Sequence, residues 1–139
     1  IPERIRRYCR ESGQRVPENE AEIVRCIDES LAFKYRMTLE EIKMCTGREY
    51  PAIHMVGGGT QSGLLCQMTA NACHCPVIAG PVEATVLGNA AVQLLAAGEL
   101  RDLDQVRSVA GASAKVSIYE PKDTDQWEQV YGQYKKMLE

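Results

Sequence analysis

Three consecutive glycines, Gly57, Gly58 and Gly59, form the pattern in this chain that points most directly to chemistry. They follow a short apolar run at residues 52–56 and precede a helical pattern that begins at Ser62. A turn without side chains lets an anion approach bare backbone N–H groups at the partially positive end of a helix. The pattern therefore favours a nucleotide phosphate as ligand. A turn that needs glycine only because it is tight remains the alternative on this motif alone.

The spacing Gly57-x-Gly59-x-x-x-Gly63 also resembles a dinucleotide-binding turn, which would bind an NAD-type cofactor. That fingerprint requires an acid about 20 residues later, at the end of the second strand. Glu83 is the nearest candidate, but it opens a helix after a Gly-Pro pair. Dinucleotide-binding domains also usually begin with this turn, whereas a long helical stretch precedes it here.

The six cysteines are irregularly spaced, which favours buried, reduced thiols over a disulfide framework. Cys66, Cys73, His74 and Cys75 could be assembled into a zinc site, but structural zinc sites usually contain two spaced pairs of ligands. The Cys73-His-Cys75 group has no matching second pair. We therefore assign no metal ligand.

Length and charge limit the possible classes of protein. The chain has 139 residues, 16 of them basic and 19 acidic, and its net charge is -3. This length allows one domain with its own core, and the sequence has no basic block typical of nucleic-acid binding. We expect neither a nucleic-acid nor a membrane partner, because no apolar run is long enough to span a bilayer. We expect a cytoplasmic location and a chain that begins within a longer protein.

The residues around the glycines predict a unit of strand, helix, strand and helix. The strands fall at residues 52–56 and 77–79, and the helices at 62–72 and 82–97. Two strands joined by a helix run parallel, so the fold class is α/β, helix-rich with a small parallel sheet. Two strands are few for such a sheet. A second copy of the chain could cover its exposed edge and give a homodimer.

The segments on either side of this unit are mainly helical. A short helix at 3–11 precedes a long one that starts near Asn19 and stops at Gly47, with Ile23, Ile27, Leu31 and Tyr35 on one face. Downstream, Asp102 can cap a short helix from 103 to about 109. An extended segment follows at 116–119, and a last helix starts near 123–125. If the first two helices form an antiparallel hairpin, Cys9 and Cys26 come level and could form a disulfide.

The residues on both sides of the glycines indicate a more specific assignment. Residues 55–67, MVGGGTQSGLLCQ, closely resemble the adenosine motif of the FGGY carbohydrate kinases. Residues 70–77 and 83–91 resemble the segments that follow it in the family, and residues 23–33 resemble a long helix of the same domain. The segments HMVGGG at 54–59 and VIAGPVEAT at 77–85 resemble the rhamnulokinase branch of the family.

This resemblance implies the second of two actin-like (ribonuclease H-like) domains, with ATP and sugar bound between them. Residues 1–50 would be a helical lead-in, 51–98 the nucleotide-binding unit and 99–139 the C-terminal helices. Gly57, Gly58 and Gly59 would contact the nucleotide. Ser62 stands where many relatives have an Asn that meets the adenine.

The same resemblance implies phosphorylation of L-rhamnulose to L-rhamnulose 1-phosphate by ATP, with Mg²⁺ bound mainly outside this chain. The family's catalytic Asp lies upstream of any residue present here, so we assign no catalytic residue. The chain is then expected to be inactive by itself. A non-enzymatic relic or interaction module with the same fold remains the alternative.

Overall fold

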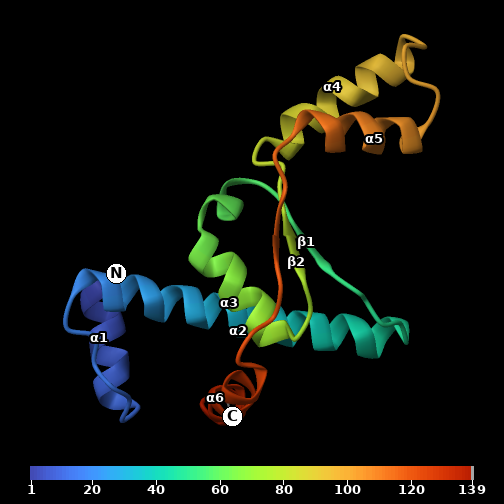
Figure 1. Ribbon diagram of the computed structural model, residues 1–139. Coiled ribbons are helices and arrows are strands. Elements are labelled where there is room, and N and C mark those ends of the chain that lie inside the picture. Colours follow the sequence, from blue (N-terminus) through green and yellow to red (C-terminus); the bar gives the residue numbers. More distant parts are fainter. Residues whose placement is uncertain (139) are drawn as a thin grey trace.

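The computed structural model describes residues 1–138 as an elongated α/β molecule (Figure 1). Helices α1 and α2 come first, and the strands and α3 follow. Helices α4 and α5 form a hairpin that projects from the body, and α6 closes the chain against α2 and α3. The elements are α1 Pro2–Glu11, α2 Glu20–Thr46, β1 Ile53–Met55, the 3-10 helix η1 Gly58–Gln61, α3 Gly63–Cys73, β2 Val77–Ala79, α4 Ala84–Ala96, α5 Leu103–Ser113, β3 Ser117–Tyr119 and α6 Thr124–Lys136.

Three short strands form one sheet in the order β1-β2-β3. β1 and β2 are parallel, as predicted, with Ile53 opposite Val77. The extended segment expected near 116–119 becomes β3 and pairs antiparallel with β2, placing Tyr119 opposite Val77. The sheet is therefore mixed, since the third strand extends the predicted parallel pair in the opposite direction.

Local capping signals set the helix ends. The Asn19 side chain accepts a hydrogen bond from the Glu22 N–H at 2.9 Å, and Gly47 ends α2 in the left-handed conformation with φ 64°. These caps confirm a single long helix of 27 residues. The Asp102 side chain likewise accepts from the Gln105 N–H at 2.8 Å, although α5 continues to Ser113, beyond the predicted end near 109.

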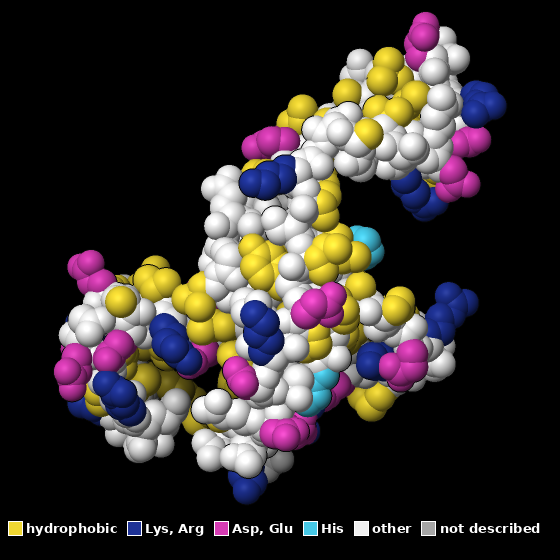
Figure 2. All heavy atoms as spheres, viewed as in Figure 1, with side chains coloured by type: hydrophobic (Ala, Val, Ile, Leu, Met, Phe, Trp, Pro, Cys, Tyr) yellow, Lys and Arg dark blue, Asp and Glu magenta, His cyan; other side chains and the backbone are white. Residues whose placement is uncertain are grey.

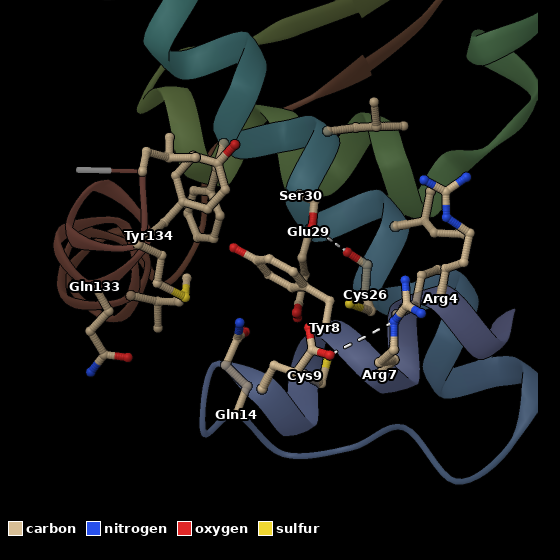
Figure 3. Close-up of a pocket in the computed structure, with 18 of the residues that line it drawn as sticks. Arg4, Arg7, Tyr8, Cys9, Gln14, Cys26, Glu29, Ser30, Gln133 and Tyr134 are labelled. Carbon is tan, nitrogen blue, oxygen red and sulfur yellow. Dashed lines mark hydrogen bonds and ion pairs between the residues drawn. The ribbon is translucent and has the colours of Figure 1, made fainter. Parts of the chain in front are cut away.

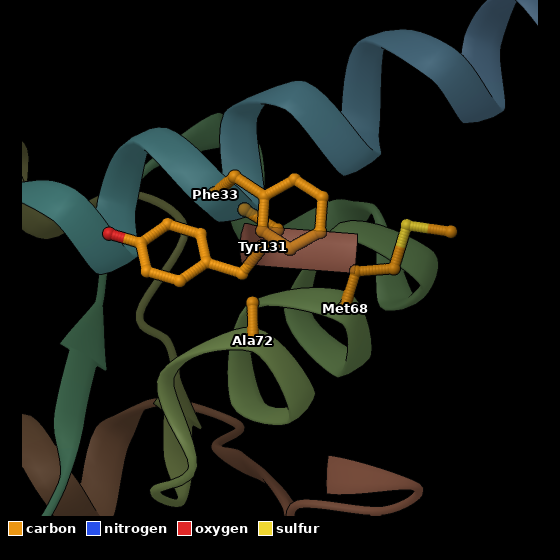
Figure 4. Packing of buried hydrophobic residues seen from close by; sticks show 5 residues of the cluster. Phe33, Met68, Ala72 and Tyr131 are labelled. Atoms are coloured by element: carbon orange, nitrogen blue, oxygen red, sulfur yellow. The ribbon is translucent and has the colours of Figure 1, made fainter. Parts of the chain in front are cut away.

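The core consists of two clusters on opposite sides of α3. One contains Ala32, Phe33, Met68, Ala72 and Tyr131, from α2, α3 and α6 (Figure 4). The other contains Cys66, Ala70, Val77 and Ala79 and joins α3 to the sheet, with Ile53, Met55 and Tyr119 packed around it. Burial on both sides holds α3, and therefore the turn that precedes it, in place.

The predicted buried face of α2 is only partly correct. Ile23 is buried, but Leu31 and Tyr35 are 38% and 39% exposed. The contact with α3 and α6 is made instead by Ala32 and Phe33. A small alanine allows the close approach of neighbouring helices, so a repeat of large apolar residues does not mark this interface.

The apolar side chains of the α4–α5 hairpin are largely exposed. None of its helical residues is buried, and Figure 2 shows apolar side chains on its visible surface. Val86, Val92 and Leu103 are all more than 60% exposed. α4 begins at Ala84, with Glu83 at its N-cap, two residues later than predicted. Within residues 1–138, no helix combines the length and the apolar character needed to cross a membrane.

Candidate functional site

The carboxyl ends of β1 and β2 bring two turns together. The glycine turn follows β1, and a second turn with Gly80 and Pro81 follows β2. The Gly57 N–H donates to the Pro81 carbonyl oxygen at 3.1 Å, and the Gly80 N–H donates to the Met55 carbonyl oxygen at 2.9 Å. Ligands of α/β proteins commonly bind at this edge of a parallel sheet. The glycine turn therefore lies at a position suited to binding.

Two backbone donors of the glycine turn remain unpaired. The Gly57 carbonyl oxygen accepts from both the N–H and the hydroxyl of Thr60, at 3.1 and 2.7 Å, which closes the first turn of η1. Gly58 and Gly59 are the first residues of η1, and the start of a helix leaves such N–H groups without an internal acceptor. Within residues 1–138 no other acceptor pairs with them. The turn can therefore donate two hydrogen bonds to a bound anion.

The space above the turn is open. A Cβ atom placed on Gly57, Gly58 or Gly59 meets no atom of the described residues within 4 Å, apart from the adjoining residues. Gly57 has φ +82°, so the backbone conformation itself favours glycine there. Gly58 and Gly59 have neither a positive φ nor a close neighbour. A tight turn thus accounts for Gly57 alone, while the other two glycines keep the approach to the backbone free.

Ser62 has a structural role that the sequence analysis did not assign to it. It is the N-cap of α3, and its hydroxyl oxygen accepts a hydrogen bond from the Leu65 N–H at 3.2 Å. Its carbonyl oxygen accepts from the Cys66 N–H at 3.0 Å. The hydroxyl oxygen therefore caps the backbone at the start of α3. The four predicted site residues still lie together in one continuous turn.

The Cys66 side chain packs against the backbone of the glycine turn. Its side chain is fully buried, with Sγ 4.0 Å from the Gly59 carbonyl oxygen, 3.9 Å from that of Thr60 and 3.6 Å from the Met55 sulfur. Burial raises the pKa of the Cys66 thiol. A thiol in this environment is a packing group rather than a nucleophile.

The phenol of Tyr119 lies at the start of α3, which the sequence analysis did not anticipate. A Cβ added to Gly63 would lie 3.2 Å from the Tyr119 hydroxyl oxygen. The extended character of residues 116–119 was visible in the sequence. Its pairing with β2 was not, because the partner residue, Val77, lies 42 positions earlier in the sequence (119 − 77). A strand register between segments so far apart leaves no local signal.

 The pairing of β3 with β2 therefore depends on the tertiary structure.

The other ionisable candidates from the sequence lie at separate elements of the described residues. Glu83 is an exposed N-cap residue of α4, and His54 is an exposed strand residue of β1. His74 ends α3 in the left-handed conformation and pairs with Glu128 at 3.6 Å. Among the described residues, no three His, Cys, Asp or Glu side chains are grouped so that they could hold a metal ion.

A hollow of the described residues lies away from the glycine turn. It is a groove of about 760 Å³ between α1, α2 and α6, with Tyr8, Cys9 and Cys26 on its wall (Figure 3). Cys9 and Cys26 have come level, as the hairpin predicted, but both are free thiols. Burial, followed by the neighbouring Cys9, raises the pKa of the Cys26 thiol. The groove and the glycine turn are thus separate features.

The chain is similar to known proteins over most of its length. Residues 2–97 match the model of the C-terminal domain of the FGGY family of carbohydrate kinases. The chain is 43% identical over 134 residues to the rhamnulokinase of Bacteroides thetaiotaomicron. The aligned region covers 96% of this chain and 28% of that protein. It is 43% identical over 117 residues to the rhamnulokinase of Klebsiella pneumoniae, covering 84% of this chain and 24% of that protein.

Proposed function

The chain belongs to the FGGY family of carbohydrate kinases, and on that premise we propose that it forms one wall of the ATP site of a sugar kinase. The observation that carries this proposal is the open glycine turn, with two unpaired N–H donors at the carboxyl edge of the sheet. In this proposal residues 51–98 are the nucleotide-binding unit. Residues 1–50 lead into it, and residues 99–139 are the C-terminal segment, whose described part contains α5, β3 and α6.

The Gly58 and Gly59 N–H groups would donate to phosphate oxygens of the nucleotide, while Gly57 gives the turn its shape. Hydrogen bonds from backbone N–H groups to a charged oxygen are stronger than those to a neutral one. The absence of side chains at these positions lets the phosphate approach the backbone closely. Ser62 would contribute through its position at the start of α3, since its hydroxyl already caps the helix.

The described residues supply only part of what phosphoryl transfer needs. The reaction requires a carboxylate that accepts the proton of the sugar hydroxyl, and Mg²⁺ to balance phosphate charge. Within residues 1–138 no three His, Cys, Asp or Glu side chains are grouped to hold that ion. The family resemblance places its catalytic Asp on no residue of this chain. We propose that these groups, and most of the sugar site, belong to the remainder of a longer protein. This chain by itself would show no turnover.

The substrate proposed is L-rhamnulose, converted to L-rhamnulose 1-phosphate in the cytoplasm. Support comes from two relatives that are named rhamnulokinases and are 43% identical to most of this chain. Because the chain spans 28% and 24% of the length of these relatives, the choice of sugar is an inference about the whole protein.

A homodimer through a sheet edge is a further part of the proposal. β1 and β3 are the two edge strands of the sheet, and an unpaired edge can accept a strand from a second copy. Light scattering of the purified chain would report a mass near twice that of the monomer if this pairing forms. A monomer at all concentrations would contradict it.

The experiment that tests the proposed function uses the full-length protein that carries this chain. ADP release is measured with ATP and L-rhamnulose, and with other ketoses for comparison. We expect Gly58→Val to raise the KM for ATP at least about tenfold and leave the KM for the sugar unchanged, since the new side chain covers the two donors. Gly111→Val, at another exposed glycine with open space around it, is the matched control. No ATP-dependent sugar phosphorylation, or equal effects of the two variants, would contradict the proposal.

A further inference from the structure

We infer that the hydroxyl of Tyr119 contacts the nucleoside part of ATP bound at the glycine turn, an inference that rests on the proposed function. Tyr119 ends β3, and its ring packs against the cluster of Cys66, Ala70, Val77 and Ala79. Its hydroxyl oxygen lies beside Gly63, the first residue of α3, at 3.2 Å from the position of an added Cβ. A polar group from the other end of the chain thus lies at the helix start that follows the turn.

The position of Tyr119 is fixed along one face of α3. Gly63, Gln67 and Asn71 follow one another at intervals of four residues, so they lie on the same side of the helix. The Gln67 side chain donates to the Glu120 carbonyl oxygen at 2.7 Å. The Asn71 side chain accepts from the Lys122 N–H at 2.9 Å. These two hydrogen bonds hold the segment after β3 against α3. The Tyr119 phenol consequently lies opposite Gly63.

The phenol hydroxyl is available for a ligand. It makes no hydrogen bond within residues 1–138, and Tyr119 is only partly buried. The hydroxyl oxygen of Ser62, which the family resemblance placed near the adenine, already accepts a hydrogen bond in the α3 cap. Tyr119 therefore offers at this end of α3 a side-chain hydroxyl that makes no hydrogen bond to the described residues.

The nucleoside is the part of ATP that this hydroxyl suits. The Gly58 and Gly59 N–H groups already supply donors for a phosphate, and a neutral phenol adds little to them. A phenol hydroxyl can both donate and accept, which matches ribose hydroxyls and the edge of a purine. Because Gly63 begins the helix that follows those donors, the hydroxyl is placed for the part of the ligand beyond the phosphates.

The test compares Tyr119→Phe with wild type in the full-length protein. We expect the KM for ATP to rise about fivefold, the size typical of losing one neutral hydrogen bond. The turnover number and the KM for the sugar should stay within about twofold, and ADP binding should weaken as the KM rises. Inhibition by inorganic tripolyphosphate should be unchanged, because that ligand lacks a nucleoside. Tyr8→Phe, at an exposed tyrosine of α1, is the control.

Each outcome decides the inference. An unchanged KM for ATP in an active wild-type background overturns the Tyr119 contact and leaves the proposed function in place. Equal weakening of ADP and tripolyphosphate also overturns it, because it shows a loosened turn rather than a lost nucleoside contact. A wild-type protein without ATP-dependent activity overturns the proposed function itself, and this inference with it.

Discussion

Gly80 holds the end of β2 against the segment that leads into β3, and its replacement by alanine is the sharpest test of the fold around the site. Its φ is +127°, and an added Cβ would lie 2.6 Å from the Lys115 carbonyl oxygen and 3.4 Å from the Val116 Cα. Both are backbone atoms, which cannot rotate away like the end of a flexible side chain. Its N–H also extends the bonding between β1 and β2 through the Met55 carbonyl oxygen.

The magnitude follows from two costs. A residue with a side chain in such a sparsely populated backbone conformation costs about 1–3 kcal/mol. Moving backbone to relieve the contact adds a cost of similar size, so Gly80→Ala should lower the free energy of unfolding by about 3–5 kcal/mol. For a chain of 139 residues, that loss corresponds to a fall in Tm of about 10 °C or more.

Urea and thermal unfolding followed by circular dichroism measure the loss. Gly58→Ala is the matched control, because Gly58 has open space and no positive φ, and we expect it to change the free energy of unfolding by less than about 0.5 kcal/mol. If Gly80→Ala unfolds within about 1 kcal/mol of wild type, the close approach of β2 to the 115–116 segment is wrong.

Three further predictions concern other parts of the chain. Gly63→Ala and Tyr119→Phe should be coupled by about 1 kcal/mol in a double-mutant cycle of urea unfolding, since Phe removes the oxygen that crowds the added methyl; additive effects would contradict the contact. The hydrogen bond from Arg36, at 2.7 Å, lowers the pKa of Glu128, so its stabilisation is present above the ordinary pKa and is lost as pH falls through the lower folded value. Glu128→Gln should therefore flatten the loss of stability on acidification below about pH 5, and an unchanged pH profile would argue against the pair. The exposed thiol of Cys45 should react first with a thiol reagent, and Cys45→Ser should abolish the fast phase; persistence of that phase would show that another cysteine is accessible.

Much of the order of elements could be predicted, because local signals set it. Asn19, Gly47 and Asp102 mark helix ends through hydrogen bonds or backbone angles that involve only near neighbours in the chain. The strand, glycine turn and helix at residues 52–72 are likewise specified by consecutive residues. Family membership could also be recognised, since its motifs are continuous in the sequence.

Features that depend on distant residues could not be predicted. The buried face of α2 was misjudged at Leu31 and Tyr35, because the contact depends on where α3 and α6 cross that helix. Arg36 shows the same limit. It hydrogen-bonds Glu40 on its own helix, pairs with Glu128 of α6 and lies 3.9 Å from the Tyr131 ring centre. A helical pattern reveals the first of these partners and neither of the others.

The sequence by itself determined a side-chain-free bend between a strand and a helix, and the family to which that bend belongs, because neighbouring residues control backbone conformation. Only the tertiary structure decided that Gly58 and Gly59 face open space, that Ser62 is used as a cap, and that Tyr119 reaches Gly63. The physical reason is sequence distance. The bond from Gln67 to Glu120, which places Tyr119, joins residues 53 positions apart, and packing across such an interval exists only once the chain has folded.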